Sequence, residues 1–232
     1  HQKINKKKDF KKNYKNYCMA RGPKKHIKRI RTPKSWMIGK LGGIWCHRPR
    51  TGPHKTRESI PLAILLRNRL KYALNGKEVI TILNDKEGTI KVDHRIRRDR
   101  KFPVGCNDIL SIEKTGENFR VLYDIKGRFV LKRIQPDEAK FKVLRVTQKS
   151  VGPNKIPYIV TNDGRTIRFP HPDISVYDSI KLNLLDNKIE DHVKFETGNV
   201  CYCFSGNNVG RVGMLTNRDR HLGGFDIVHM RD

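Results

Sequence analysis

The expected fold follows from one stretch of the chain, residues 59–112, which reads SIPLAILLRNRLKYALNGKEVITILNDKEGTIKVDHRIRRDRKFPVGCNDILSI. Serine is a preferred N-cap and proline is tolerated in the first helical turn, so Ser59-Ile60-Pro61 predicts the start of a helix. Apolar residues then recur at helical spacing as far as Leu74. Asn75-Gly76 is expected to end this helix.

A second helix and a set of short strands complete the stretch. Val79, Ile82 and Leu83 are expected to face inward from the second helix, which ends at residues 85–88. The following strands are expected at Thr89–Val92, Arg95–Asp99 and Ile109–Ile112, with a tight turn at Asp93-His94 and a lead-in at Pro103–Gly105. Two helices and a small sheet predict a compact helix-helix-hairpin module over residues 58–113.

The outer face of this module is basic. Because the whole chain is basic, this face favours RNA contact over a merely solvated surface. It carries Arg67, Lys71, Arg95, Arg97, Arg98, Arg100 and Lys101. Arg69 falls inside the apolar arc of the first helix. Its charged head either reaches water past a packed stem or anchors a phosphate, and the spacing leaves both roles open.

Composition excludes several classes of function. The chain has 232 residues with 50 Lys and Arg against 23 Asp and Glu, a formal charge of +27. A charge of this size favours nucleic acid or an anionic membrane and is atypical of a soluble enzyme. No run of about eighteen apolar residues is present to span a bilayer, and no apolar segment near the start predicts a secretory signal. The lysine-rich start lacks the amphipathic apolar face that membrane-surface binding needs, so no membrane partner is expected.

The cysteines do not predict a metal site. Five are present, an odd number without framework spacing, and Cys201-x-Cys203 is a single pair. A zinc site needs more ligands at finger-like spacing. No metal and no cofactor are therefore expected.

The first 57 residues predict two basic segments. Residues 1–18 are lysine-rich and poor in apolar side chains, so we expect a disordered extension. Residues 19–57 combine scattered proline and glycine with both tryptophans, which predicts an extended arm that folds onto RNA. Trp36 is expected either to stack on a base or to pack the arm down. The expected phosphate contacts of the arm are Arg21, Lys24, Lys25, Lys28 and Arg29.

The remainder of the chain reads as short strands between turns. Regular spacing of this kind predicts a small central β barrel or sandwich over residues 114–195. The glycine-rich segment 206–213 within residues 196–232 resembles the KOW motif, a small β barrel that often touches RNA, with Arg211 as a weaker RNA contact. Strands are expected at Arg120–Asp124, Arg128–Ile134, Phe141–Gln148, Ile156–Thr161, Arg165–Phe169 and Ile180–Leu185, with turns at Lys126-Gly127 and Asn162–Gly164 and one helical turn at Pro136–Ala139.

Several segments together resemble the e-type S4 family of small ribosomal subunit proteins. They are Met-Ala-Arg-Gly-Pro-Lys-Lys-His (19–26), Thr-Gly-Pro-His-Lys (51–55), Leu-Arg-Asn-Arg-Leu-Lys-Tyr-Ala-Leu (66–74), Lys-Thr-Gly-Glu-Asn-Phe-Arg (114–120), Lys-Gly-Arg-Phe (126–129), Arg-Thr-Ile-Arg (165–168) and Thr-Asn-Arg-Asp-Arg-His (216–221). The resemblance implies an α+β multidomain chain of arm, S4-type module, central β domain and KOW unit. It implies a structural role in the small subunit, with ribosomal RNA and neighbouring ribosomal proteins as partners. It also implies residence in cytoplasmic ribosomes, with a nucleolar assembly stage in a eukaryote, and neither catalysis nor a small-molecule substrate.

The sequence departs from this family in three places. A lysine tail of eighteen residues precedes the family's usual start. His94 stands where such hairpins commonly carry glycine, which adopts positive φ more easily. The family continues beyond Asp232 with a further basic tail, so we expect an incomplete last barrel or a fragment.

Two other classes remain as alternatives. S4-type modules also accompany RNA-modifying enzymes, but Asp163 and Asp178 lie in turns, where aspartate is structurally common, and no paired carboxylates indicate an active site. A KOW-bearing regulatory factor that binds RNA would share the glycine-rich segment. It would not explain the arm or the helix pair.

Overall fold

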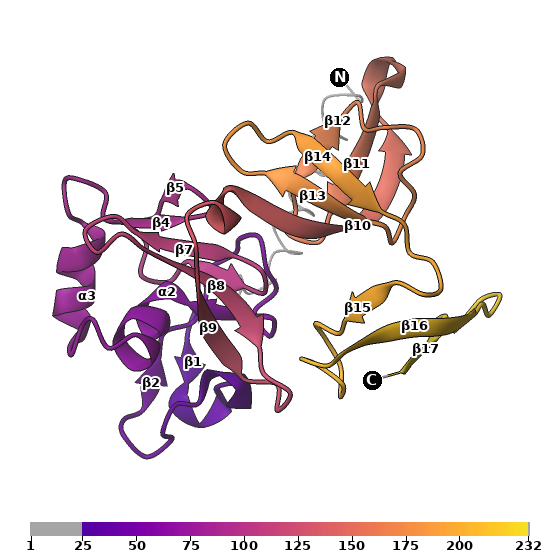
Figure 1. Cartoon of the computed structure of the whole chain (residues 1–232). Coiled ribbons are helices and arrows are strands. Elements are labelled where there is room, and N and C mark those ends of the chain that lie inside the picture. Colours follow the sequence, from indigo (N-terminus) through magenta and orange to yellow (C-terminus); the bar gives the residue numbers. More distant parts are fainter. Residues whose placement is uncertain (1–24, 232) are drawn as a thin grey trace, which may run out of the picture.

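The computed structural model of the chain describes residues 25–231 and is mostly β, with few and short helices (Figure 1). Two five-stranded sheets and one three-stranded sheet make up most of it, in the orders β5-β4-β7-β8-β9, β12-β11-β10-β13-β14 and β15-β16-β17. The elements are β1 (Ile27–Lys28), η1 (Arg29–Arg31), η2 (Lys34–Trp36), β2 (Trp45–Cys46), β3 (Ser59–Pro61), α2 (Leu62–Ile64), η3 (Leu65–Arg69), α3 (Gly76–Leu83), β4 (Ile90–Val92), β5 (Arg95–Ile96), β6 (Pro103–Gly105), β7 (Ile109–Ile112), β8 (Glu117–Tyr123), β9 (Phe129–Ile134), η4 (Glu138–Lys140), β10 (Phe141–Val151), η5 (Pro153–Lys155), β11 (Pro157–Thr161), β12 (Thr166–Arg168), β13 (Ser179–Asn183), β14 (Ile189–Val193), β15 (Val200–Tyr202), β16 (Val212–Asp219) and β17 (Ile227–Arg231).

The first five-stranded sheet packs against the helices over the largest core of the protein. Val79 and Leu83 of α3 are buried in this core and Ile82 packs against it, as the spacing predicts. The turn between β4 and β5 forms as expected, because Asp93 and His94 both adopt positive φ, at 50° and 59°. The sheet runs past residue 113, since β7 pairs with β8. The expected division into domains at that residue stays a prediction.

The prediction for the start of the first helix is wrong. Ser59-Ile60-Pro61 forms strand β3, which pairs with Pro103–Gly105, and the N-cap of α2 is Pro61. All three residues of β3 are buried, so a distant strand partner outweighs the local capping pattern.

The prediction for the end of that helix is wrong as well. The helix widens into the π-helix η3 and stops at Leu70, because Lys71 adopts a left-handed φ of 58°. Leu74 is 80% exposed and does not belong to the apolar stripe. Asn75 instead begins α3, with the Glu78 carboxylate accepting hydrogen bonds from the backbone N–H groups of Leu74 and Asn75, at 2.7 and 3.4 Å.

The second five-stranded sheet is organised by the eleven-residue strand β10. Its first half pairs with β13 and its second half pairs with β11, with an irregular register between Val146 and Gln148. This arrangement surrounds a smaller core that includes Leu144, Val146 and Ile180. The six strands expected between residues 120 and 185 are present as β8 to β13, of which β8 and β9 belong to the first sheet. The helical turn before β10 is present as well, and the ends of these elements are displaced by a few residues. The sheet is open, with β12 and β14 as its edges, rather than closed into a barrel.

The C-terminal strands β15, β16 and β17 form an open antiparallel sheet. It contacts the first sheet through Tyr202, whose hydroxyl accepts the Tyr123 N–H at 2.8 Å. Gly210, at φ 88°, lies so close to the Asp124 carbonyl that a Cβ at this position would overlap the carbonyl oxygen. The KOW assignment of this unit stays a prediction. No helix in residues 25–231 is long and apolar enough to cross a membrane.

The described part of the arm is packed onto the module. Strands β1 and β2 pair, and Trp36 is fully buried in the main core, where its indole N–H donates to the Ser59 carbonyl at 2.8 Å. Trp36 therefore packs the arm down, which is one of the two expected roles. It has no exposed surface on which a base could stack.

Replacing Trp36 with alanine should destabilise the protein by about 3–5 kcal/mol, because a large buried side chain and its hydrogen bond are lost. Urea unfolding followed by circular dichroism measures the change. Trp45→Ala is the matched control, since Trp45 is 59% exposed. It should shift stability by no more than about 0.5 kcal/mol. Equal losses in both variants would show that the arm is not held by Trp36.

Candidate nucleic-acid interface

A buried lysine joins the two five-stranded sheets. The Lys142 ammonium group, on β10, lies 2.5 Å from Asp108, 2.8 Å from Asp93 and 3.4 Å from Asp163. The first two aspartates come from turns of the first sheet, and Asp163 lies in the β11–β12 turn of the second. Arg165 extends the network, at 2.9 Å from Asp93 and 2.7 Å from Asp163. We call these five residues the lysine hub.

Lys142 and Asp108 are held in their charged forms because each compensates the burial of the other. Burial alone would raise the pKa of Asp108, but the Lys142 ammonium and His54, at 2.8 Å, outweigh it and hold the pKa well below its usual range. Burial alone would lower the pKa of Lys142, and the carboxylates of Asp108, Asp93 and Asp163 raise it instead. A buried charge needs such partners, since leaving it unpaired costs several kcal/mol.

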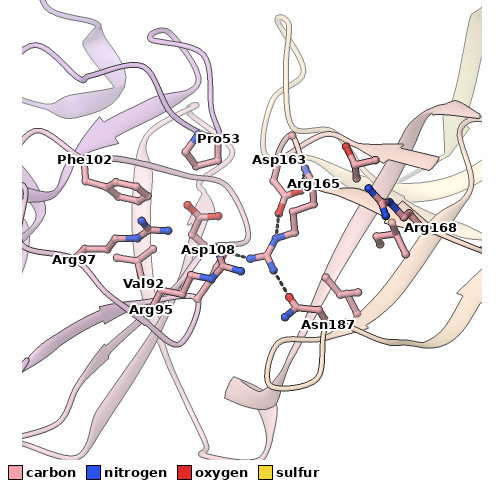
Figure 2. A pocket seen from close by; sticks show the side chains of 15 residues that line it. Pro53, Val92, Arg95, Arg97, Phe102, Asp108, Asp163, Arg165, Arg168 and Asn187 are labelled. Atoms are coloured by element: carbon pink, nitrogen blue, oxygen red, sulfur yellow. Dashed lines mark hydrogen bonds and ion pairs between the residues drawn. The ribbon is translucent and has the colours of Figure 1, made fainter. Parts of the chain in front are cut away.

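An arginine-lined cleft opens beside the lysine hub, between the two sheets (Figure 2). Its volume is about 550 Å³. Arg95 and Arg97 line it from the first sheet, and Arg165 and Arg168 line it from the second. The carboxylates in its walls already hold Lys142 and Arg165. The cleft therefore presents net positive charge.

A second basic surface forms where the arm runs beside the module. The Arg50 N–H donates to the Lys101 carbonyl at 2.9 Å, and its side chain pairs with Asp99 at 3.2 Å. Burial lowers the pKa of His47, and nearby Arg100 and Arg67 lower it further. Module and arm thus place their cations close together, although they are far apart in sequence.

The expected RNA contacts divide into several groups. Arg21 and Lys24 lie outside the described residues. Arg95 and Arg97 come together in the cleft, while Lys25, Lys28, Lys71, Arg98 and Arg211 are exposed at separate places. Arg67 is partly buried, and its Nε donates to the Asn68 side chain at 3.1 Å.

Two expected contacts have structural partners within the chain. Arg29 donates to the carbonyls of Gly39 and Gly42 and so holds the glycine-rich loop of the arm. Arg69 donates to the Ser35 carbonyl at 3.3 Å and contacts the Met37 sulfur, so its head ties the arm to the module. Both guanidinium groups are therefore less available to a phosphate than the sequence suggests.

Four residues near these basic surfaces are not among the RNA contacts predicted from the sequence. They are Lys142, Arg165, Arg168 and Trp45. A signal for Lys142 exists in the sequence, because it alternates with Leu144 and Val146 on one face of a predicted strand. A lysine at an inward position requires a carboxylate partner. No local signal distinguishes the buried Trp36 from the exposed Trp45 or brings Arg165 beside Arg97.

Two family models match the chain. "Ribosomal family S4e" matches residues 115–189, and the "RS4NT (NUC023) domain" matches residues 21–57. Together they cover nearly all of the arm, strands β8 and β9 of the first sheet and nearly all of the second sheet.

Similar proteins carry names of the same kind. The small ribosomal subunit protein eS4 of Tetrahymena thermophila is 59% identical over 213 residues, which are 92% of this chain and 82% of that protein. The corresponding protein of Ixodes scapularis is 58% identical over 214 residues, covering 92% of this chain and 81% of its own. The crystal structure of the 30S ribosomal protein S4e from Thermoplasma acidophilum is 31% identical, with a TM-score of 0.64, and the match covers 75% of this chain and 88% of that one.

Replacing Lys142 with methionine should lower the free energy of unfolding by about 3–5 kcal/mol at neutral pH, because the buried Asp108 and Asp163 and the partly buried Asp93 lose their central cation. Equilibrium urea unfolding measures this loss. Lys140→Met is the control, since Lys140 makes an exposed pair with Asp137 and its loss should cost no more than about 1 kcal/mol. A loss as small as that of the control would contradict the role of the lysine hub.

The stability of the native chain should fall as the pH drops through about 4. Asp108 and Asp163 have pKa values lower in the folded chain than in the unfolded chain, where they lie near the usual ~3.9. The unfolded state then binds more protons, so acid favours it. The free energy of unfolding of Lys142→Met should approach that of the native chain at low pH, because acid neutralises the clustered carboxylates that lost their cation. Urea titrations at several pH values test both trends, and parallel curves would refute the second.

Proposed function

Because this chain belongs to the ribosomal family S4e and is a structural, non-catalytic constituent of the small ribosomal subunit, we propose that it binds ribosomal RNA through its basic arm and module. The identity of 59% over 92% of the chain carries this conclusion. The charge of +27 supplies the attraction, since phosphate neutralisation releases counterions.

The surface between arm and module is the main proposed contact. Arg67 and Arg100 approach His47 there, and Lys71 stands exposed after the helix. Lysine and arginine at such positions contact phosphates without reading sequence. The packing of Trp36 supports a preformed platform rather than an arm that folds only on RNA.

Trp45 is the proposed base-stacking residue of the arm. It is 59% exposed and faces Lys28 directly across the β1–β2 pair. The His26 ring lies beside it, with centroids 5.7 Å apart. An exposed aromatic ring next to cations suits a splayed base and its phosphate.

Two further proposals, on the C-terminal glycine-rich loop and on the location of the protein in the cell, depend on the same ribosomal role. We propose that the glycine-rich loop between β15 and β16 is a KOW-type contact, because Gly210 allows close backbone approach there and Arg211 is exposed. We also propose that the chain works in cytoplasmic ribosomes after a nucleolar assembly stage in a eukaryote. Asp163 and Asp178, weighed above as catalytic groups, hold Arg165 and backbone N–H groups instead.

Sedimentation of native lysate on a sucrose gradient tests the assignment. The protein should travel with the small subunit and remain there through a high-salt wash, because many buried contacts support the charge. Its recovery at the top of the gradient, or its release at modest salt, would contradict an integral place in the subunit.

Replacing Arg67 and Lys71 together with alanine should weaken binding to small-subunit ribosomal RNA. The slope of log affinity against log salt should flatten by about 0.7–0.9 for each lost phosphate contact. Filter binding over a salt series measures the slope, while melting confirms the fold.

The control for this pair is Lys77→Ala with Lys86→Ala, which removes two exposed charges on and after α3. It should leave a steeper slope than the test pair. Equal slopes in both variants would remove Arg67 and Lys71 from the interface.

A further inference from the structure

We propose that the arginine-lined cleft between the two five-stranded sheets binds a phosphodiester segment of ribosomal RNA, with Arg97 and Arg168 as its principal ligands. The inference rests on the proposed RNA-binding function and assigns part of it to a site shared by both sheets. The cleft, of about 550 Å³, lies within the usual size range of ligand pockets.

The environment of the Arg97 side chain is the first observation that supports this proposal. Its guanidinium carbon lies 4.3 Å from the centre of the Phe102 ring, which fixes the plane of the group (Figure 2). Its Nε is buried and has no hydrogen-bond partner among the described residues. Burial lowers the pKa of Arg97, and neighbouring Arg95 lowers it further. An anion in the cleft would pair with the Arg97 guanidinium group and balance its charge.

The distribution of carboxylates is the second reason. Three carboxylates line the cleft, those of Asp93, Asp108 and Asp163, yet Lys142 pairs with each of them and His54 also pairs with Asp108. Asp93 and Asp163 hold Arg165 as a fixed wall, and Asn187 accepts another of its hydrogen bonds at 3.1 Å. Five cationic groups, the four arginines and Lys142, thus face three carboxylates.

The arrangement of the free arginines favours RNA over an acidic protein segment. Arg97 stands on one wall and Arg168 on the opposite wall, with Arg165 reaching between them (Figure 2). Planar guanidinium groups on opposing walls match the oxygens of a phosphate, which projects acceptors in several directions. An RNA backbone held in this way contacts both sheets at once.

The test compares Arg97→Gln with Arg168→Gln, as a pair and singly, in the full chain. The probe is small-subunit ribosomal RNA of Tetrahymena thermophila, the source of a relative 59% identical. Filter binding over a salt series should show the slope of log affinity flattened by about 1.4–1.8 in the pair, if each arginine neutralises one phosphate. The matched control, Lys77→Gln with Lys132→Gln, removes two exposed charges outside the cleft.

Each outcome decides a separate point. A flattening beyond that of the control supports the cleft, and slopes equal to the control overturn it. Unchanged RNA binding with lost binding of a neighbouring ribosomal protein would overturn it in favour of an acidic protein segment.

Arg168 is exposed and makes no side-chain hydrogen bond or ion pair within residues 25–231, so Arg168→Gln alone tests the cleft even where the pair misfolds. Native chain that fails to bind RNA at all would refute the proposed function rather than the cleft alone.

Discussion

One buried ammonium group constrains how this protein is assembled. Lys142 has about 1% of its side chain exposed, so it needs carboxylates that come from turns far apart in sequence. Asp93 and Asp108 reach it from the first sheet and Asp163 from the second. An apolar contact of Ile109, Ala139 and Leu184 lies at the same junction. The two sheets are therefore joined by the buried salt bridges of Lys142 and by a small apolar cluster beside them.

This pairing also shapes the charge of the surface. The carboxylates that line the cleft are turned toward Lys142 and Arg165, and among the described residues Arg95, Arg97 and Arg168 form no salt bridge. Within the arm and module, Trp36 plays a comparable part, since its burial fixes a basic segment that carries few apolar side chains. A protein with a net charge of +27 thus uses several of its few acids in internal structure and presents arginine and lysine outward.

Local pattern predicts most of the elements but not their long-range partners. The inward face of α3, strands β8 to β13 and the turn at Asp93-His94 follow from periodicity and turn chemistry. Ser59-Ile60-Pro61 carries a helix-start pattern, yet pairing with residues 103–105 makes it a strand, and no local rule reveals that partner. Only one wall of the cleft is predictable, because Arg95 and Arg97 belong to the basic module. Arg165 and Arg168 join them only through the contact between sheets.

The most direct test of the lysine hub is nuclear magnetic resonance of lysine ammonium groups in the native chain at neutral pH. Exposed ammonium protons exchange rapidly with water, whereas a buried and paired group exchanges slowly. We expect a persistent ammonium signal that disappears in Lys142→Met and remains in Lys140→Met. A native spectrum without a protected ammonium would show that Lys142 is exposed to water, and would contradict the proposed junction of the two sheets.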